Sequence, residues 1–418
     1  MASAHRSAEL EAWAEAESET WRGQPIGRVH TRLTRNGLHM AFVALFAVLG
    51  GAIRSFNLLV ILAGLLISIL LMQWRFARGT LPGLTVSRQL PQEAFAGIPF
   101  KVRFQVTNHR RWLPAWLIRL EDAIGGPRLP ARGARAGCAV SITHPGSTET
   151  TSYECVITRR GRYRFGPVRL TTAFPFGLIR AWKNTRTHTN FVVFPQLARL
   201  QNNWTGMIEN RREGLAASRH TSGPNEGEFF GIRNWQSGDS RRWIHWRTTA
   251  RIGELAVRQF EQRNRTQLSL MLDPYSAISG EEDDAKLEWA ISVAAAMVID
   301  VASLATSRLA FCVADNSERV LVSHRSSHFR RAALQTLATT KPLAEPDLAA
   351  GLVRLLGRSN PRWPIVIVSP RAPDLESLAV DAEGNRLMSP GLLNRLDIIW
   401  IDVMSDAAKR IAVPRVKH

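Results

Sequence analysis

The sequence predicts a multidomain protein with an N-terminal transmembrane helical hairpin, an antiparallel β-sandwich-like domain and a C-terminal α/β domain. Three observations lead to this prediction. Two apolar stretches lie between residues 38 and 74, short alternating segments continue to about residue 200, and apolar strand patterns alternate with helical patterns after residue 262. The first pattern is typical of membrane spans, the second of an antiparallel sheet and the third of a mainly parallel sheet.

The composition indicates a globular protein with a strongly basic charge. The chain has 418 residues, with 54 Lys plus Arg against 35 Asp plus Glu and a formal net charge of +19. This length is enough for two or three domains with sizeable cores. The charge favours contact with nucleic acid, phospholipid headgroups or an acidic partner. We favour the headgroups, because an arginine-rich composition suits a protein tethered to an anionic leaflet.

The cysteines give an expectation about the redox compartment. Cys138, Cys155 and Cys312 are widely spaced and form no C-x-x-C pair. We interpret them as free thiols in a reducing compartment, with a single disulfide pair as the alternative.

Residues 1–37 are predicted to be a cytoplasmic N-terminal tail. Residues 8–21 are acidic and alanine-rich, with apolar side chains at roughly helical spacing. A loose amphipathic helix and a disordered tail both fit this pattern. Residues 22–37 are basic and lie just ahead of an apolar run, as expected of a membrane flank.

Residues 38–74 form the predicted transmembrane hairpin. The apolar stretches 38–53 and 56–74 are separated only by Arg54 and Ser55, and the second approaches the roughly 20 residues of a bilayer crossing. The first is shorter and holds His39, Gly50 and Gly51, so two arrangements fit it: it begins among the headgroups, or it leans on the second through its small residues. A cleaved signal peptide is the competing interpretation. We disfavour it because the preceding region is long and no small-residue cleavage site precedes a new charged start.

The arginines around this hairpin predict its orientation. Arg54 is alone in the turn, whereas several arginines flank the hairpin on the other side. The positive-inside rule therefore places both termini in the cytoplasm. The flanking residues are Arg28, Arg32 and Arg35 before the hairpin and Arg75, Arg78 and Arg88 after it.

Residues 84–200 are predicted to be the β-sandwich-like domain, and the polar residues 201–225 a linker. Short segments with alternating apolar side chains and turn signals between them argue for antiparallel strands. The strands are expected near residues 84–88, 100–106, 116–120, 153–157, 163–170 and 191–194.

Residues 262–418 are predicted to be the α/β domain. Its alternation of strands and helices argues for a mainly parallel sheet covered by helices on both faces. Strands are expected at residues 268–273, 309–313, 320–322, 364–369 and 397–403, and helices at 286–305 and 327–337.

Residues 226–261 are the densest cluster of unusual side chains, with arginines around Trp235, Trp243 and Trp246. Gly238 supplies a turn, Asp239 or Ser240 can cap a following helix over residues 241–251, and Gly253 ends it. On a helical wheel Trp243, Trp246 and Ala250 share one face, which we expect to pack inward in the seam between the domains. Arg241, Arg247 and Arg251 would offer their guanidinium groups to carboxylates, carbonyls or phosphates.

The run RNWQSGDSRRWIHWRTTAR, within residues 229–261, resembles the signature of the domain-of-unknown-function 58 family of membrane-anchored bacterial proteins. The resemblance implies two transmembrane helices, a β domain, this signature and a von Willebrand factor A-like α/β domain in the bacterial inner (cytoplasmic) membrane, with the soluble domains in the cytoplasm. It also implies a MoxR-type AAA ATPase as partner and brings no catalytic activity. The TRRGRYRFGP run from Thr158 and the FPFGL run from Phe174 are similar to further marks of the family. The candidate partner-binding residues are Arg233, Trp235, Gly238, Asp239, Arg241, Arg242, His245, Trp246, Arg247 and Arg251.

The resemblance also raises the question of a metal. A von Willebrand A domain often binds Mg²⁺ through D-x-S-x-S after its first strand, because hard cations take several oxygen ligands. The run that starts at Asp273 keeps the aspartate but has Tyr275 and Ala277 in place of the serines, and Ser369 stands where a later strand often ends in aspartate. We therefore expect no metal and no cofactor, with Asp273 capping the following turn.

The functional interpretation is a membrane-anchored cytoplasmic scaffold or assembly factor that binds protein partners. The first alternative is an enzyme that uses Asp239, His245 and the arginines on a phosphorylated or envelope substrate, with His245 as general base. It is disfavoured because the sequence has no nucleophile elbow, H-E-x-x-H or P-loop motif. The second is a binder of anionic lipid or nucleic acid. No nucleic-acid-binding module is visible, so nucleic acid is the less favoured ligand.

Overall fold

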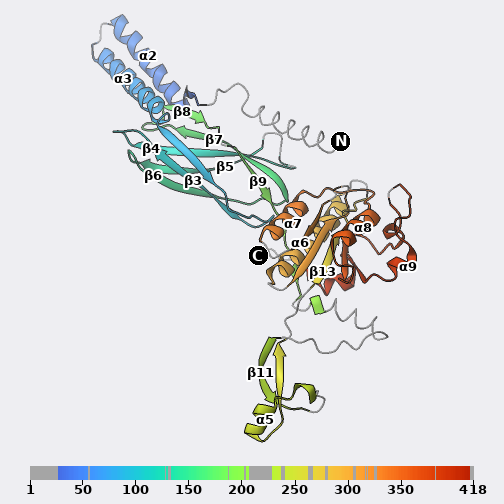
Figure 1. The fold of residues 1–418 in the computed structure, drawn as a ribbon. Coiled ribbons are helices and arrows are strands. Elements are labelled where there is room, and N and C mark those ends of the chain that lie inside the picture. The colour runs from blue at the N-terminus through green and yellow to red at the C-terminus, as the bar shows by residue number, and fades with distance from the viewer. Residues whose placement is uncertain are drawn as a thin grey trace. The chain divides into compact units, whose positions relative to one another are not determined.

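The computed structural model describes residues 27–54, 57–127, 129, 133–186, 188–201, 204–206, 228–236, 241–261, 267–277, 281–304, 307–315, 317, 319–323, 327–381 and 383–414. The chain divides into two compact units, Met1–Gln196 and Leu197–His418 (Figure 1). Each unit has its own elements and core.

Two long apolar helices open the N-terminal unit. Helix α2 covers Arg35–Arg54 and helix α3 covers Asn57–Thr80, and both are long and apolar enough to cross a membrane. Gly50 and Gly51 lie where the helices approach each other, since an added Cβ would come within 2.9 Å of the Leu59 side chain and 2.7 Å of the Val60 side chain, respectively. The predicted close packing through small residues is therefore confirmed. Helix α3 also continues past the predicted end at residue 74.

The segment before these helices is partly a strand. Strand β1 (Val29–Leu33) pairs antiparallel with β8 (Ile179–Asn184). We had assigned residues 29–33 to the tail, and that assignment is wrong for them. The apolar residues at both ends of VHTRL suit a sheet, and the pairing partner lies far along the chain, where the local charge pattern gave no sign of it.

Two antiparallel sheets follow in the N-terminal unit. The larger runs in the order β1-β8-β7-β4-β5 with β9 paired to β7, and the smaller runs β2-β3-β6. Residues of both sheets share one hydrophobic core. The other strands are β2 (Leu84–Gln89), β3 (Phe100–Asn108), β4 (Ala115–Gly125), β5 (Ala134–Thr143), β6 (Thr148–Cys155), β7 (Gly161–Thr172) and β9 (Thr189–Val193).

The core of this unit follows from the strand period of two. In β3 every second residue is buried, beginning with Phe100, Val102 and Phe104, while the lysine and arginine between them face outward. Five of the predicted strands are confirmed in position, whereas the strand expected at residues 153–157 begins earlier and ends at Cys155. Strands β5 and β8 were missed, because neither shows a clear apolar alternation.

A buried ion pair joins the two sheets of this unit. Arg88 of β2 donates from Nη2 to Asp122 Oδ1 of β4 at 2.5 Å, and both side chains are fully buried. Tyr153 Oη of β6 donates to Asp122 Oδ2 at 2.8 Å. Burial raises the pKa of Asp122, and Arg88 and Tyr153 oppose that shift. This network therefore links the two sheets, and its formation requires the burial of two charged side chains.

The C-terminal unit contains the mainly parallel sheet that the sequence predicts. Its order is β15-β14-β13-β16-β17, with only β15 antiparallel to its neighbour. Helices α6 and α7 lie on one side of the sheet and α8 on the other (Figure 1). The elements are β13 (Gln267–Leu272), α6 (Glu281–Ser303), β14 (Arg308–Val313), β15 (Val320–Val322), α7 (Ser327–Thr339), α8 (Leu348–Arg358), β16 (Ile365–Ser369), η2 (Glu376–Leu378), α9 (Pro390–Leu393), β17 (Ile398–Asp402) and α10 (Asp406–Lys409).

The start of this unit includes residues that we had placed elsewhere. Strand β10 (Arg199–Leu200) pairs with β18 (Ala412–Val413), so it belongs to the C-terminal unit and not to the β domain. Trp204, in the predicted linker, is buried and donates from Nε1 to Asp300 Oδ2 of α6 at 2.7 Å. Trp204 of the predicted linker is thus packed, and linker residues 202–203 and 207–225 lie outside the described part of the chain.

Candidate functional site

The candidate site is a hairpin between the first unit and the parallel sheet in the sequence, which we call the signature hairpin (residues 228–261). Strands β11 (Glu228–Asn234) and β12 (Ala256–Glu261) pair antiparallel, with a register shift between Phe229 and Gly231. A short 3₁₀ helix η1 (Arg241–Trp243) and the helix α5 (Trp246–Ile252) lie between the strands. The tip of the hairpin therefore carries the arginines and tryptophans of the sequence motif.

The helix at this tip begins later than predicted. Its N-cap is His245, whose side chain accepts a hydrogen bond from the Thr248 backbone N–H, and not Asp239 or Ser240. Gly253 ends it in the left-handed conformation with φ 79°, as predicted, and donates to the Thr249 carbonyl at 2.9 Å. The predicted turn at Gly238, with Asp239, lies outside the described residues.

Two threonines of α5 hold the helix in place, and one of them connects it to the strands. The Thr249 hydroxyl accepts from the Ala256 N–H at 3.0 Å, at the start of β12. The His245 N–H donates to the Ala256 carbonyl at 2.8 Å, and Ile244 forms an isolated bridge with Val257. The backbone of the tip is thus held by its own hydrogen bonds. Sequence reasoning missed these threonines, although hydroxyl residues in the first turn of a helix are a usual capping signal.

The small core of the hairpin differs from the predicted one. Ile244, Ala256 and Val257 are buried, whereas the Trp246 side chain is 67% exposed and Ala250 is also exposed. The prediction that Trp246 and Ala250 pack inward is therefore wrong, and Trp243 is only half-buried. A seven-residue helix beside a single pair of strands can bury only a narrow strip of side chains. Ile244, just before the helix, already packs against the strands there.

The exposed surface of the signature hairpin combines apolar and cationic side chains. Ile232, Trp235, Ile252 and Leu255 join Trp246 as exposed large apolar residues. Arg233 is half-buried and donates from Nη1 to the Asn234 carbonyl at 3.0 Å. The arginines exposed beside these apolar residues are Arg241, Arg242, Arg247, Arg251 and Arg258.

The geometry of His245 favours a structural role over general-base catalysis. Its Nδ1 accepts from the Thr248 N–H at 3.3 Å and lies 2.7 Å from the Thr248 hydroxyl. Both contacts hold Nδ1 against Thr248 at the start of α5. The Nδ1 nitrogen is therefore engaged at the N-cap of the helix.

We expect His245→Ala to loosen the start of α5 without altering the rest of the unit. Loss of a capping side chain costs about 1 kcal/mol, which corresponds to roughly fivefold faster exchange of the Thr248 amide hydrogen. Hydrogen exchange on the full-length chain measures this directly. His245→Asn is the matched control, because asparagine also caps and should preserve the protection. Unchanged exchange in His245→Ala would show that the ring does not hold the helix.

The second candidate position is the carboxyl end of β13. Asp273 is fully buried, and its Oδ2 accepts from Ser369 Oγ at 2.8 Å and from Arg371 Nε at 2.9 Å. Its Oδ1 accepts from the Tyr275 N–H at 3.1 Å, which is the turn cap that the sequence predicts. The Arg371 guanidinium also stacks over the Tyr275 ring, with 4.2 Å between Cζ and the ring centroid.

These residues do not fit a Mg²⁺ ion. Asp273 contributes a single carboxylate, and Arg371 already places a positive charge on its Oδ2. Burial raises the pKa of Asp273 while Arg371 and Ser369 oppose the shift. No group of three or more potential metal ligands occurs among the described residues. The Arg371 guanidinium therefore already supplies the positive charge beside Asp273. The sequence analysis considered Ser369 but not Arg371, which lies two residues further along the chain.

This arrangement predicts that Mg²⁺ leaves thermal stability unchanged. A cation that bound only the native state would raise the melting temperature by mass action. We expect the melting temperature of the full-length chain to be the same with and without millimolar MgCl₂ at matched ionic strength. A saturable upward shift specific to Mg²⁺ or Mn²⁺ would contradict the account of Asp273.

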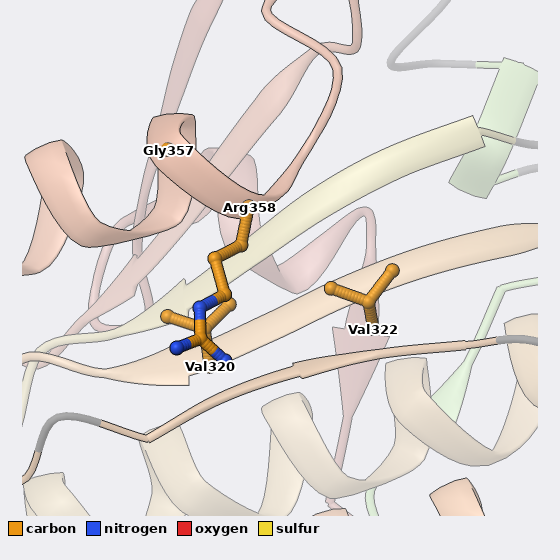
Figure 2. A pocket seen from close by; sticks show the side chains of 4 residues that line it. All are labelled: Val320, Val322, Gly357 and Arg358. Atoms are coloured by element: carbon orange, nitrogen blue, oxygen red, sulfur yellow. The ribbon is translucent and has the colours of Figure 1, made fainter.

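The remaining reactive groups offer little chemistry. The three cysteines are unpaired, and burial raises the pKa of Cys155 to about 11 and that of Cys312 to about 12. Such thiols are almost wholly protonated at neutral pH and are poor nucleophiles. An open hollow of about 500 Å³ lies at β15 and the end of α8. It is lined by Val320, Val322, Gly357 and Arg358, whose side chains are shown in Figure 2. This lining contains no acid or base pair.

Comparison with known proteins covers this part of the chain. Residues 231–382 match the family described as "Protein of unknown function DUF58". This stretch belongs to the DUF58 family. The DUF58 stretch begins in β11, includes α5 and the strands β12 to β16, and ends after η2. The signature hairpin and the Asp273 position both fall inside it.

One curated relative and two solved structures give further likenesses. Over 133 residues the chain is 27% identical to "Uncharacterized protein YeaD" of Bacillus subtilis (strain 168), which is 32% of this chain and 33% of that protein. The chain thus matches about a third of that relative's length. A β-glucosidase from Listeria innocua is 14% identical, with 26% of this chain and 15% of that chain covered at a TM-score of 0.19. A superoxide reductase (neelaredoxin) from Ignicoccus hospitalis is 17% identical, with 24% and 77% covered at a TM-score of 0.16. TM-scores this low support no conclusion about fold or activity.

Proposed function

We propose that the chain is a membrane-anchored scaffold or assembly factor whose signature hairpin binds a protein partner, a MoxR-type AAA ATPase. One observation carries this proposal: the exposed Trp246 at the tip of a hydrogen-bonded hairpin, surrounded by exposed arginines. Tryptophan and arginine are the residues most enriched at the energetic centres of protein interfaces. The partner class rests on the resemblance of the motif to its family.

The capping geometry supports binding over catalysis. His245 Nδ1 and the two threonines of α5 are engaged in holding the backbone, so they make the tip rigid. A rigid tip loses little conformational entropy when a partner binds, which favours affinity. The acidic partner surface expected here would meet the guanidinium groups of Arg241, Arg247 and Arg251.

The rest of the chain fits this role as an anchor and a platform. The two sheets with one core support a β-sandwich-like assignment for the N-terminal unit. The mainly parallel sheet with helices on both faces supports a von Willebrand factor A-like, metal-independent domain. The two apolar helices support the membrane anchor. The flanking arginines and the family resemblance support the bacterial inner membrane with the soluble parts in the cytoplasm.

The topology gives a prediction that tests the location of this interaction. A reporter fused after His418 should be active only in its cytoplasmic form, because the flanking arginines hold both ends of the hairpin inside. A reporter inserted between Arg54 and Ser55 should be active only in its exported form. The opposite pattern would place the signature hairpin on the wrong side of the membrane for an ATPase and would overturn the proposal.

A further inference from the structure

One end of the N-terminal unit carries exposed aromatic and apolar side chains beside the two long helices. They come from residues 110–117, around the start of β4, and from residues 173–178, between β7 and β8. We call these two segments the collar. Trp112 is 80% exposed and Phe176 is 54% exposed, and Leu113, Trp116 and Leu117 are also exposed. So many large apolar side chains at one end of a unit indicate a contact surface.

The collar is attached to the ends of both apolar helices. Gln73 of α3 is buried and donates from Nε2 to the Ala173 carbonyl at 3.0 Å and the Ile179 carbonyl at 3.2 Å. Thr34, just before α2, donates to the Gly177 carbonyl at 2.6 Å. A Cβ at Gly37 would collide with the Leu178 carbonyl oxygen, so α2 lies directly against the collar. Figure 1 shows α2 and α3 extending away from the sheets of the unit beside β8.

The two segments of the collar also contact each other and are held firmly. The Trp116 and Phe174 rings stack with centroids 5.4 Å apart and an interplanar angle of 14°. Asn108 is fully buried and donates from Nδ2 to the Leu113 carbonyl at 3.1 Å. Leu117 has φ 46°, which is unfavourable for a leucine, and its side chain is nevertheless exposed. A strained backbone that displays an apolar side chain to solvent points to a function for that side chain.

Arginines lie over aromatic rings of the collar and of α3. The Arg111 guanidinium lies over the Trp112 ring at 5.5 Å, and that of Arg78 over the Trp74 ring at 5.3 Å. Burial and the positive charge of Arg75 lower the pKa of Arg110. Arginines on one surface favour contact with anions.

We propose that the collar is a membrane-contact surface that lies in the headgroup layer of an anionic leaflet. Trp112, Leu117 and Phe176 reach the boundary of the acyl chains, and the arginines of the collar and of the end of α3 bind lipid phosphates. The inference rests on the proposal that α2 and α3 cross a membrane. It adds that the β domain is seated on the bilayer and is not merely tethered to it.

The chemistry of the collar favours lipid over other occupants. Tryptophan at the headgroup level and arginine beside it form the usual belt at the ends of membrane spans. The collar adjoins the apolar helix α3, because Gln73 donates hydrogen bonds to the carbonyls of Ala173 and Ile179, at the start of its second segment and just after it. Trp74 and Arg75 follow Gln73 directly in the sequence. Any membrane that holds the helices would therefore bring its headgroups to the collar.

The test uses the full-length chain in nanodiscs of mixed anionic and zwitterionic lipid, with a polarity-sensitive fluorophore on single introduced cysteines. The accessible native thiol is removed by Cys138→Ala, and the buried Cys155 and Cys312 are retained. The probes are Trp112→Cys and Phe176→Cys. Val156→Cys is the matched control, since Val156 is 55% exposed but follows Cys155, which pairs with Phe100 at the opposite end of β3 from the collar. Leu62→Cys in the middle of α3 reports whether the helices are in the bilayer.

We expect lipid-borne nitroxides to quench the probes at 112 and 176 at least threefold more than the probe at 156, and aqueous iodide to do the reverse. Replacing the anionic lipid by a zwitterionic one should reduce the difference. If the probe at 62 is quenched but those at 112 and 176 behave like 156, the collar proposal is overturned and the anchor stands. If the probe at 62 is not quenched, the anchor itself fails. Protection from iodide without nitroxide quenching would identify a protein surface as the occupant and would also overturn the proposal.

Discussion

Asp122→Ala should destabilise the N-terminal unit by about 3 to 5 kcal/mol, the usual result when one partner of a fully buried ion pair is removed. The Arg88 guanidinium would keep its burial but lose the carboxylate to which its Nη2 donates at 2.5 Å. Its remaining acceptors are the Phe165 carbonyl at 3.0 Å and the Thr189 hydroxyl at 3.2 Å, both from Nη1. Neither acceptor neutralises the charge, so the guanidinium would be left buried without an anion.

Two further variants separate the charge from the packing. Tyr153→Phe removes one hydrogen bond to the carboxylate and should cost about 1 to 3 kcal/mol. The double variant Arg88→Met with Asp122→Leu removes both charges and should be more stable than Asp122→Ala. Hydrogen exchange of β4 and β7 in the full-length chain measures the stability of all three variants. A loss below about 1 kcal/mol for Asp122→Ala would show that the pair is not what joins the sheets.

Elements with strong local patterns were predictable from the sequence. The apolar helices, the alternating strand β3 and the buried strands β13 and β16 are each encoded by their own residues. Gly253 was predictable as a helix end because glycine adopts the left-handed conformation readily. Helix α8 was missed although Leu348, Leu352 and Leu355 repeat at helical spacing and are all buried. That signal was available in the sequence.

The predictions that failed concern contacts between residues that are distant in the sequence. Strand β1 needs β8, which lies some 150 residues later and has no strong pattern of its own. Arg371 and Asp273 are 98 residues apart, so no local motif could place the guanidinium on the carboxylate. The helical wheel predicted which side chains share a face with Trp246. It could not show whether another part of the protein covers that face. The collar likewise joins two segments that lie far apart in the sequence.

Trp246→Ala should weaken capture of the partner by at least 30-fold while leaving the fold intact. A tryptophan at the centre of an interface contributes about 2 kcal/mol or more, which corresponds to that factor. Because the side chain is 67% exposed, its removal from the free protein should change stability by no more than about 0.5 kcal/mol. This expectation replaces the larger destabilisation that an inward-facing tryptophan would give. Leu375 of the same unit is also 67% exposed and provides the matched control Leu375→Ala.

The most direct test of the proposed docking role is site-specific photo-crosslinking from native membranes. A benzophenone amino acid replaces Trp246 in one full-length variant and Leu375 in another, and adducts are identified by mass spectrometry. We predict a discrete adduct with a MoxR-type AAA ATPase at position 246 and none at 375. An ATPase adduct of equal yield at both positions, or no protein adduct at 246 in a chain that is folded and in the membrane, would contradict the assignment of the signature hairpin as the docking surface.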